Sequence, residues 1–261
     1  MKTQRIKAKI KSNTRVAQGY YKLAIAAPAV AKTAKPGNFL MLKVCGGNEP
    51  LLRRPLSIHS AGRIGPGIVE LLYEVVGPGT GILSHKKSGQ QIDVIGPLGN
   101  GFSIGACGPR SHVILVAGGM GVAPLVFLAQ RVKADKVTVL IGARTSAHIL
   151  CGSDFRKLGC DVRIATDDGT RGFHGRVTGL LENILARKAK TAPVLYGCGP
   201  KPMLKAMSGL CSKAGVAAQI SLESHMACGI GACLGCVVQT KDGFQRVCKE
   251  GPVFQADELV W

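Results

Sequence analysis

The sequence is short of aromatic and acidic residues. Phe, Trp and Tyr make up 5% of the 261 residues, and 15 Asp and Glu stand against 34 Lys and Arg, a formal net charge of +19. The basic residues are spread along the chain, and only Arg187-Lys188-Ala189-Lys190 forms a basic run. With few rings for base stacking and no nucleic-acid motif, we expect no nucleic-acid partner. The charge instead favours solubility and docking on an acidic partner.

The sequence also lacks a long apolar run without glycine or proline. The longest uncharged stretch, Val113–Gln130, contains three glycines and Pro124, so a buried strand, a glycine turn and a helix explain it better than a membrane span does. Residues 2–15 show no secretory signal. We therefore expect a cytoplasmic protein with no membrane partner. Its ten cysteines are then reduced thiols or metal ligands.

The first hundred residues are rich in short strand patterns separated by turn signals such as Gly77-Pro78-Gly79. The expected strands are Arg5–Val16, Tyr20–Ala26, Phe39–Val44, Leu56–His59, Ile68–Val76 and Gln91–Ile95. With one helix near Thr80–Lys87, they predict a small antiparallel barrel.

Strand and helix patterns alternate after Gly105. The expected strands are His112–Ala117, Lys136–Ile141, Asp161–Thr166, Pro193–Tyr196 and Val216–Leu222, and the expected helices are Val122–Lys133, Ser153–Leu158, Arg176–Ala186 and Pro202–Ala214. Five such units predict a doubly wound sheet that binds a nucleotide at the carboxyl ends of its strands. The predicted class is α+β, with a barrel domain over 1–104, an α/β nucleotide-binding domain over 105–222 and a small cluster domain over 223–261.

Four cysteines fall within the last 34 residues. Cys228, Cys233, Cys236 and Cys248 are spaced C-x4-C-x2-C-x11-C, and the first three match the plant-type [2Fe–2S] spacing. The intervening glycines allow a tight loop whose N–H groups can point at the sulfurs. Structural zinc and unligated core cysteines are the alternatives, although zinc favours paired C-x2-C motifs and only one such pair is present.

A glycine turn opens the nucleotide-binding half. Gly118, Gly119 and Gly121 follow an expected strand and precede an expected helix, so backbone and helix N-terminus can approach a pyrophosphate. A turn needed only for packing explains them equally well. Cys198 and Gly199 end the fourth strand, where Cys198 is either a neighbour of a nicotinamide ring or a small buried residue. Asp167-Asp168-Gly169-Thr170 is a solvated turn or a ribose contact.

Five motifs together resemble the ferredoxin-reductase-like flavoprotein superfamily: Arg54-Pro55-Leu56-Ser57, Gly79-Thr80, the glycine turn at Gly118, Tyr196–Pro200 and the cysteine tail. Within it, Met226–Cys236 is similar to the electron-transfer subunit of class 1B dihydroorotate dehydrogenase. The resemblance covers nearly the whole chain, in the order of flavin barrel, nucleotide domain and C-terminal cluster. The family's Pro-Gly-Gln-Phe turn is changed here to Pro36-Gly37-Asn38-Phe39.

The resemblance implies residues that bind FAD. Arg54 would pair with its pyrophosphate, and Pro55, Leu56 and Ser57 would line the isoalloxazine, with the Ser57 hydroxyl near N5. Leu71, Leu72 and Tyr73 would supply backbone bonds and a ring, while Gly79 and Thr80 would hold the pyrophosphate at the start of a short helix. Taken alone, Arg54 is equally an ordinary surface charge and Tyr73 a core aromatic residue. No side chain is needed as a general acid or base.

The resemblance also implies a function. Electrons would pass from the FMN of a dihydroorotate dehydrogenase catalytic subunit, through [2Fe–2S] and FAD, to NAD⁺ in pyrimidine biosynthesis, within a heterotetramer of two copies of each subunit. The nearest alternative is the small subunit of a sulfide dehydrogenase or NADH-dependent ferredoxin:NADP⁺ oxidoreductase. Another is a zinc-stabilised nucleotide-binding regulatory protein. The second strand of the nucleotide domain ends in Gly142-Ala143-Arg144, without an acidic residue that would bind a ribose 2′-hydroxyl. The expected preference for NAD over NADP is therefore implied by the resemblance alone.

A visible spectrum separates the redox interpretation from the zinc one. We expect the protein purified without oxygen to show flavin and [2Fe–2S] absorption bands. A colourless protein that contains zinc in place of iron and sulfide would contradict the redox interpretation.

Overall fold

A computed structural model describes residues 3–47, 49–105, 107–187 and 192–261, so Lys188, Ala189 and Lys190 of the basic run lie outside the described residues. The chain divides into two units. The first contains Met1–Gly101, Ser224–Val237 and Gln245–Pro252, and the second contains Phe102–Glu223, Val238–Phe244 and Val253–Trp261. The tail is therefore shared between the units, and the expected division into three domains stays a prediction. Among the described residues, no helix is long and apolar enough to cross a membrane.

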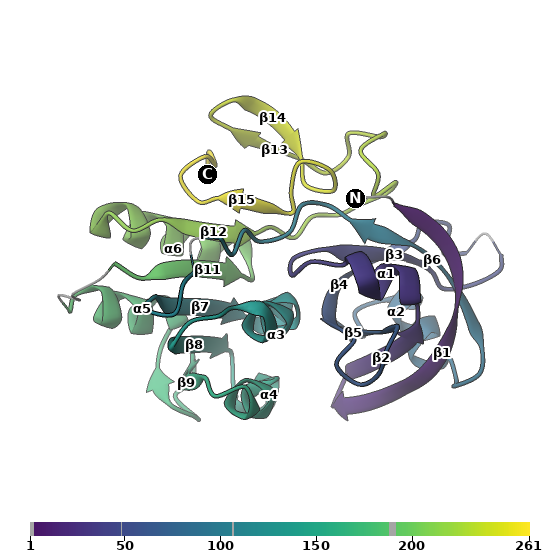
Figure 1. Ribbon diagram of the computed structural model, residues 1–261, viewed down its shortest axis with the longest axis horizontal. Coiled ribbons are helices and arrows are strands. Elements are labelled where there is room, and N and C mark those ends of the chain that lie inside the picture. The colour runs from purple at the N-terminus through teal and green to yellow at the C-terminus, as the bar shows by residue number, and fades with distance from the viewer. Residues whose placement is uncertain (1–2, 48, 106, 188–191) are drawn as a thin grey trace. The chain divides into compact units, whose positions relative to one another are not determined.

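Six antiparallel strands of the first unit close into a barrel in the order β1-β2-β5-β4-β3-β6 (Figure 1). They are β1 (Gln4–Ala17), β2 (Tyr20–Ala26), β3 (Phe39–Lys43), β4 (Arg54–Ala61), β5 (Ile68–Glu74) and β6 (Gln91–Leu98). Aliphatic side chains such as Ile10, Leu23 and Val94 are fully buried in it. Because β1 pairs with β6, closure leaves no open sheet edge. The predicted antiparallel barrel is confirmed.

Two short helices accompany the barrel, α1 (Pro28–Thr33) and α2 (Pro78–Ser84). The second corresponds to the helix expected near Thr80. The first was not expected, because six residues are too few to show a helical period. Pro28 occupies its first turn, where the missing N–H costs no helical hydrogen bond.

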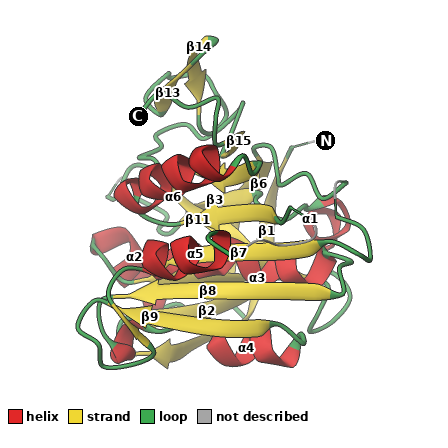
Figure 2. Ribbon diagram, turned by 90° about the vertical axis from the view of Figure 1, so that its left-hand side faces the viewer, coloured by secondary structure: helices red, strands yellow, loops and turns green. Residues whose placement is uncertain are grey.

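The second unit is built on a seven-stranded sheet of order β10-β9-β8-β7-β11-β12-β15. The strands are β7 (His112–Gly118), β8 (Lys136–Ala143), β9 (Asp161–Thr166), β10 (Phe173–His174), β11 (Val194–Cys198), β12 (Ala218–Ser221) and β15 (Val253–Gln255). All pair in parallel except β15, which is antiparallel to β12. In Figure 2, α5 (Val177–Leu185) and α6 (Lys201–Ala214) cover one face, and α3 (Val122–Arg131) and α4 (Gly152–Lys157) cover the other. The predicted doubly wound sheet is confirmed.

The tail contributes secondary structure that was not expected. A hairpin of β13 (Val237–Thr240) and β14 (Gly243–Arg246) follows the first three clustered cysteines. The chain then adds β15 to the edge of the parallel sheet through pairs such as Ile220 with Phe254. Three-residue strands show too little alternation to be recognised in a sequence.

The first residues of the second unit are attached to the sheet by a buried tyrosine. The Tyr196 hydroxyl on β11 donates to Ser103 O at 2.9 Å and lies 3.0 Å from Cys107 Sγ. Its ring is fully buried and meets Phe102 edge to face, with 5.5 Å between ring centroids. Burial raises the pKa of Tyr196 well above its ordinary value. The phenol therefore stays a neutral donor at this position.

Removing that hydroxyl should destabilise the second unit. We expect Tyr196→Phe to lower the free energy of unfolding by about 1 kcal/mol, since Ser103 O loses one donor but keeps another from Gln219. Urea unfolding followed by circular dichroism measures the change, with Tyr21→Phe as the matched control. Equal midpoints for Tyr196→Phe and the parent chain would show that the bond contributes nothing.

Candidate functional site

The four clustered cysteines come together within the first unit. Cys228, Cys233 and Cys236 lie on an irregular loop between β12 and β13, and Cys248 lies on the turn after β14. Val247 N in this turn donates to Cys236 O at 2.9 Å. The thiols interact mainly in two pairs, Cys228 with Cys233 and Cys236 with Cys248. A [2Fe–2S] core is held by four thiolates, two on each iron, so an arrangement in two pairs suits it.

Backbone N–H groups point at the sulfurs of the clustered cysteines. Ile230 N and Ala232 N donate to Cys228 Sγ at 3.5 and 3.3 Å, Gly235 N donates to Cys233 Sγ at 3.4 Å, and Cys248 N donates to Cys236 Sγ at 3.4 Å. A backbone hydrogen bond from Gly231 also acts on Cys248. Gly229 and Gly231 have φ values of 70° and 84°, which L side chains rarely adopt, so these glycines let the loop turn its amides inward. Such donors stabilise thiolates and tune a cluster.

The environments of these thiols differ strongly. Burial raises the pKa of Cys228, but backbone N–H bonds and the contact with Cys233 outweigh it and lower the pKa to about 6. Burial and the contact with Cys236 raise the pKa of Cys248 to about 12. Cys236 and Cys248 are buried, whereas Cys233 is exposed. One side of the set is therefore accessible from solvent and the other is enclosed.

The cysteine loop packs on the barrel within the first unit. A Cβ at Gly229 would lie 2.5 Å from Met41 Cγ, so the loop backbone rests directly on this fully buried side chain of β3. After Cys248 the chain is held by Asn100, whose Nδ2 donates to Glu250 O at 2.8 Å. Asn38, in the altered Pro-Gly-Gln-Phe turn, is fully buried and donates to Gly99 O at 2.7 Å. The barrel thus supports both segments that carry cysteines.

The residues expected to line a flavin form a half-buried strip on β4. Arg54, Pro55, Leu56 and Ser57 are each partly exposed, whereas the next four residues of the strand are buried. Arg54 Nη1 donates to Leu52 O at 2.9 Å. A Cβ at Gly79 would lie 2.2 Å from Arg54 Nε. Arg54 and Gly79 are therefore brought together, and only glycine leaves room for the guanidinium there.

The other residues expected at the flavin are more enclosed. Leu71, Leu72 and Tyr73 are buried on β5. The Tyr73 hydroxyl donates to Asn13 Oδ1 at 3.0 Å, its ring stacks on Tyr21, and burial raises its pKa to about 12. Thr80 Oγ1 accepts from Val76 N at 2.9 Å and from Gly77 N at 3.2 Å, and the second bond caps α2. The Tyr73 ring and the Thr80 hydroxyl are thus engaged locally, and their roles at a flavin stay predictions.

The glycine turn and the end of β11 meet closely at the carboxyl edge of the sheet. A Cβ at Gly121 would lie 2.0 Å from Cys198 O, and one at Gly199 would lie 3.0 Å from Gly118 Cα. Gly119 has a φ of 52°. Gly119–Gly121 form a 3-10 turn that runs directly into α3, and Val122 N donates within it to Gly119 O, so the helical segment begins at the glycine turn itself. The structure therefore brings Gly118, Gly119, Gly121, Cys198 and Gly199 together.

Cys198 is a buried thiol at this edge. Burial, followed by the negative charge of Glu223, raises the pKa of Cys198 well above its ordinary value. It is therefore a neutral small side chain, which fits a place beside a nicotinamide ring without attacking it.

The Asp167–Thr170 segment is an exposed turn with hydrogen bonds between its own residues. Asp168 Oδ1 accepts from Thr170 N at 3.0 Å and from Thr170 Oγ1 at 2.7 Å. These bonds lower the pKa of Asp168. Arg144, at the end of β8, is exposed. A carboxylate already bonded to Thr170 supports the solvated-turn interpretation.

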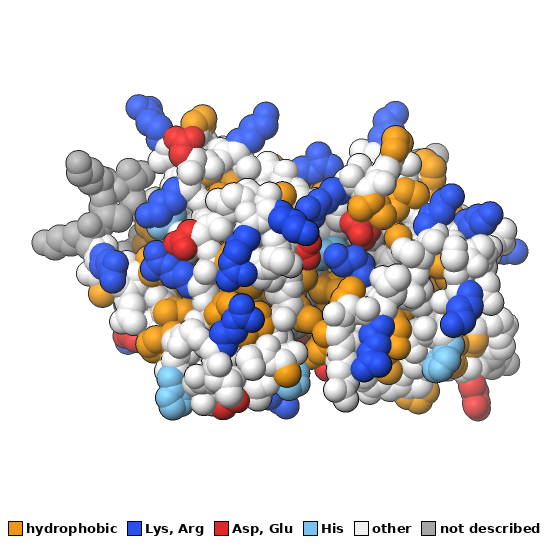
Figure 3. Space-filling view, turned by 90° about the horizontal axis from the view of Figure 1, so that it is seen from below, with side chains coloured by type: hydrophobic (Ala, Val, Ile, Leu, Met, Phe, Trp, Pro, Cys, Tyr) orange, Lys and Arg blue, Asp and Glu red, His pale blue; other side chains and the backbone are white. Residues whose placement is uncertain are grey.

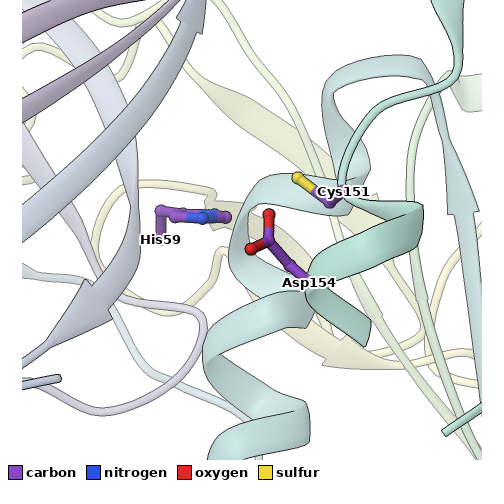
Figure 4. Close-up of side chains that lie close together, drawn as sticks. All are labelled: His59, Cys151 and Asp154. Carbon is purple, nitrogen blue, oxygen red and sulfur yellow. The ribbon is translucent and has the colours of Figure 1, made fainter. Parts of the chain in front are cut away.

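Among the residues that the structure describes, no other charged side chains form a comparable arrangement within either unit. On the face shown in Figure 3, Lys and Arg side chains are scattered and do not gather in one patch. Figure 4 labels His59, a buried residue of β4, and two residues at the start of α4. Cys151 precedes that helix with a φ of 59°, and Asp154 lies in its first turn.

Sequence reasoning missed Arg246 and Glu250. Both flank Cys248 and form an ion pair four residues apart. Arg246 Nη1 also donates to Gly231 O at 2.8 Å. The opposite charges at i and i+4 are visible in the sequence, but their relation to the loop depends on the fold.

Known families match two parts of the chain. Residues 223–260 match the iron–sulfur cluster binding domain of dihydroorotate dehydrogenase B, and residues 115–209 match the oxidoreductase NAD-binding domain. These segments contain all four clustered cysteines and the glycine turn with Cys198 and Gly199.

Two solved structures resemble the chain. That of an NADH-dependent reduced ferredoxin-NADP oxidoreductase superposes with a TM-score of 0.84 at 29% identity, covering 97% of this chain and 90% of the other. A ferredoxin NADP⁺ reductase from Neisseria gonorrhoeae with bound FAD and NADP superposes with a TM-score of 0.67 at 19% identity, covering 81% and 92%. The second likeness shows the fold alone.

Relatives of known name extend over nearly the full length. The electron transfer subunit of dihydroorotate dehydrogenase B (NAD(+)) from Desulforamulus reducens is 44% identical over 260 residues, which covers 97% of each chain. The subunit of the same name from Caldanaerobacter subterraneus subsp. tengcongensis is 40% identical over 261 residues, covering 98% and 99%. On this similarity and the geometry of its cysteine tail, the chain belongs to the family of electron transfer subunits of dihydroorotate dehydrogenase B.

Proposed function

We propose that this chain transfers electrons to NAD⁺ from a catalytic subunit, which oxidises dihydroorotate. The electrons pass through a [2Fe–2S] cluster and FAD, both held by residues of this chain. The observation that carries the proposal is the set of four paired thiols with N–H donors aimed at them, in the same unit as the half-buried strip of β4. When bound, the cluster supplies one-electron transfer and the flavin exchanges two electrons as hydride with NAD⁺. Full-length similarity to the named relatives supports this function.

The tail would hold the cluster through Cys228, Cys233, Cys236 and Cys248. The backbone N–H groups aimed at Cys228, Cys233 and Cys236 support this, because they stabilise the thiolate, which is the ligand form. Exposure of Cys233 leaves one edge of the set open toward a partner, and the buried Cys236 and Cys248 exclude water from the other.

The barrel would hold FAD along β4. Arg54 offers a forked cation for the pyrophosphate beside Gly79, where a larger residue would displace it. Pro55, Leu56 and Ser57 offer a flat, half-exposed strip for the isoalloxazine. The backbone of Leu71, Leu72 and Tyr73, on the strand next to β4, would bind the ring edge.

The second unit would hold NAD(H) at the carboxyl edge of its sheet. The turn of Gly118, Gly119 and Gly121 would receive the pyrophosphate at the start of the helical segment that continues into α3. Cys198 and Gly199 would lie at the nicotinamide. No side chain acts as an acid or base, since hydride transfer between flavin and nicotinamide needs only orientation of the two rings.

The name of the family implies a catalytic partner subunit. We propose that this partner contains FMN, that two copies of each chain form a heterotetramer in the cytoplasm, and that the exposed Cys233 side of the cluster faces the partner. Co-purification of the two chains with measurement of mass and FMN content tests this assembly.

A second candidate is supported by the likeness to the NADH-dependent reduced ferredoxin-NADP oxidoreductase. In that function the same cofactors would serve a different partner, and NADP would be a substrate. Steady-state kinetics with NADH and NADPH, together with the identity of the co-purified subunit, separate the two candidates.

Loss of one expected cluster ligand should break the electron route at a defined place. We expect Cys233→Ser to abolish dihydroorotate-dependent NAD⁺ reduction by the assembled complex, while FAD is still reduced by NADH, because the barrel and sheet are untouched. The matched control is Cys45→Ser, which removes a half-buried thiol elsewhere in the first unit. Unchanged turnover in Cys233→Ser would reject the route.

Crowding the glycine turn should weaken nucleotide binding selectively. The Cβ of Gly121→Ala would overlap the backbone at Cys198, and overpacking of this kind costs about 1–3 kcal/mol. We expect the KM for NADH to rise about tenfold or more while iron and FAD contents stay at parent levels. Gly209→Ala, on α6 with open space around its Cα, is the control. Equal KM values for Gly121→Ala and the parent would place the pyrophosphate elsewhere.

A further inference from the structure

Arg246 connects the two segments that carry the clustered cysteines. It is the last residue of β14 and begins the turn that contains Cys248. Its Nη1 donates to Gly231 O at 2.8 Å, and Gly231 lies between Cys228 and Cys233 in the loop. A single side chain thus spans from the fourth cysteine to the first two.

Glu250 fixes the direction of the Arg246 guanidinium. Arg246 Nε donates to Glu250 Oε2 at 2.9 Å, Nη2 pairs with Oε1, and Arg246 N donates to Oε2 at 2.8 Å. A carboxylate that receives two parallel N–H bonds holds the planar fork in one orientation. The remaining nitrogen, Nη1, is therefore aimed at Gly231.

The backbone of the turn is closed around Cys248. Arg246 O accepts from Lys249 N at 3.1 Å, from Glu250 N at 2.9 Å and from Gly251 N at 3.2 Å. The Lys249 stem covers Gly231, where a Cβ would lie 2.6 Å from Lys249 Cδ. Because Arg246 and Cys248 belong to one rigid turn, a shift of the guanidinium would also move the thiol.

The backbone and the Arg246 side chain hold different parts of the loop. Val247 N donates to Cys236 O, and Cys248 N donates to Cys236 Sγ. These bonds fix the third cysteine against the fourth. The bond from Arg246 to Gly231 extends the connection to the segment with Cys228 and Cys233. The side chains of Arg246 and Glu250 are 27% and 32% exposed, so water only partly screens the pair.

We propose that Arg246 is a positioning residue of the [2Fe–2S] site: it holds the Cys228–Cys233 segment in register with Cys248, and Glu250 orients it. This inference rests on the proposed function, because it assumes that the four thiols bind the cluster. The Arg246 guanidinium balances the negative charge of Glu250 next to the turn that contains Cys248. Without the guanidinium, the unbalanced carboxylate would disfavour the reduced, more negative state of the site.

The test compares five full-length proteins purified without oxygen and with FAD: the parent, Arg246→Gln, Arg246→Lys, Glu250→Gln and Lys241→Gln. Lys241 is an exposed residue of the same hairpin, so its substitution removes equal charge without touching the turn. The measurements are iron and acid-labile sulfide per chain, the rate of iron release to bathophenanthroline, and the midpoint potential of the cluster from its electron paramagnetic resonance signal.

We expect Arg246→Gln to release iron about tenfold faster than the parent, as loss of a hydrogen bond from a charged group implies, and to show a lower midpoint potential. Arg246→Lys should also release iron faster, because it lacks the fork, but should keep a midpoint near that of the parent, because it keeps the charge. Glu250→Gln should release iron faster as well. Lys241→Gln should match the parent in both measurements.

Parent-like iron release and midpoint in Arg246→Gln would overturn the inference. FAD content and reduction of FAD by NADH, measured on the same samples, identify a variant that has lost its fold. In that case Arg246→Lys and Glu250→Gln decide, and parent-like iron release in both would overturn the inference. A parent protein without iron and sulfide would instead reject the proposed function itself.

Discussion

The arrangement of the tail depends on hydrogen bonds from backbone amides to cysteine sulfur. Four thiols held close together repel one another as they ionise, and the N–H groups of the loop offset this repulsion. Their effect is visible at Cys228, whose pKa they lower, in contrast with Cys248, whose pKa is raised by burial and by Cys236. The positive φ values of Gly229 and Gly231, and the contact of Gly229 with Met41, follow from the need to turn these amides inward.

The proposed cluster ligands and the half-buried strip of β4 share one unit, and the residues proposed to bind the nucleotide occupy the other. Met41 connects the cysteine loop with the half-buried strip of β4. Its backbone pairs with Pro55 on β4, and its side chain contacts Gly229 of the loop. An electron carrier requires short, fixed separations between cofactors. A closed barrel with a loop packed directly on its wall provides such separations better than a tethered domain does.

The sequence predicted most of the fold, and it named candidate site residues that the structure brings together. The strands Tyr20–Ala26 and Asp161–Thr166 were predicted to the residue, because their apolar runs end at clear turn signals. The cysteine spacing and the glycine turn identified the loops where residues come together. The sequence could not predict Arg246 reaching Gly231, or Asn38 reaching Gly99, because these contacts join residues that only the tertiary fold brings near. The strand β15 was also not predicted, because it has three residues and pairs with a strand of only four, β12.

The chain passes between the units several times in its tail. After Glu223 it contributes the cysteine loop to the barrel unit, the tip of the hairpin to the sheet unit, the Cys248 turn to the barrel unit and β15 to the sheet. A chain cut before the loop would therefore lose more than a cluster: β12 would become a bare edge strand with unpaired amides, a site for intermolecular association. Because the tail contributes segments to both units, cutting the chain at a single linker would not divide it into two complete units.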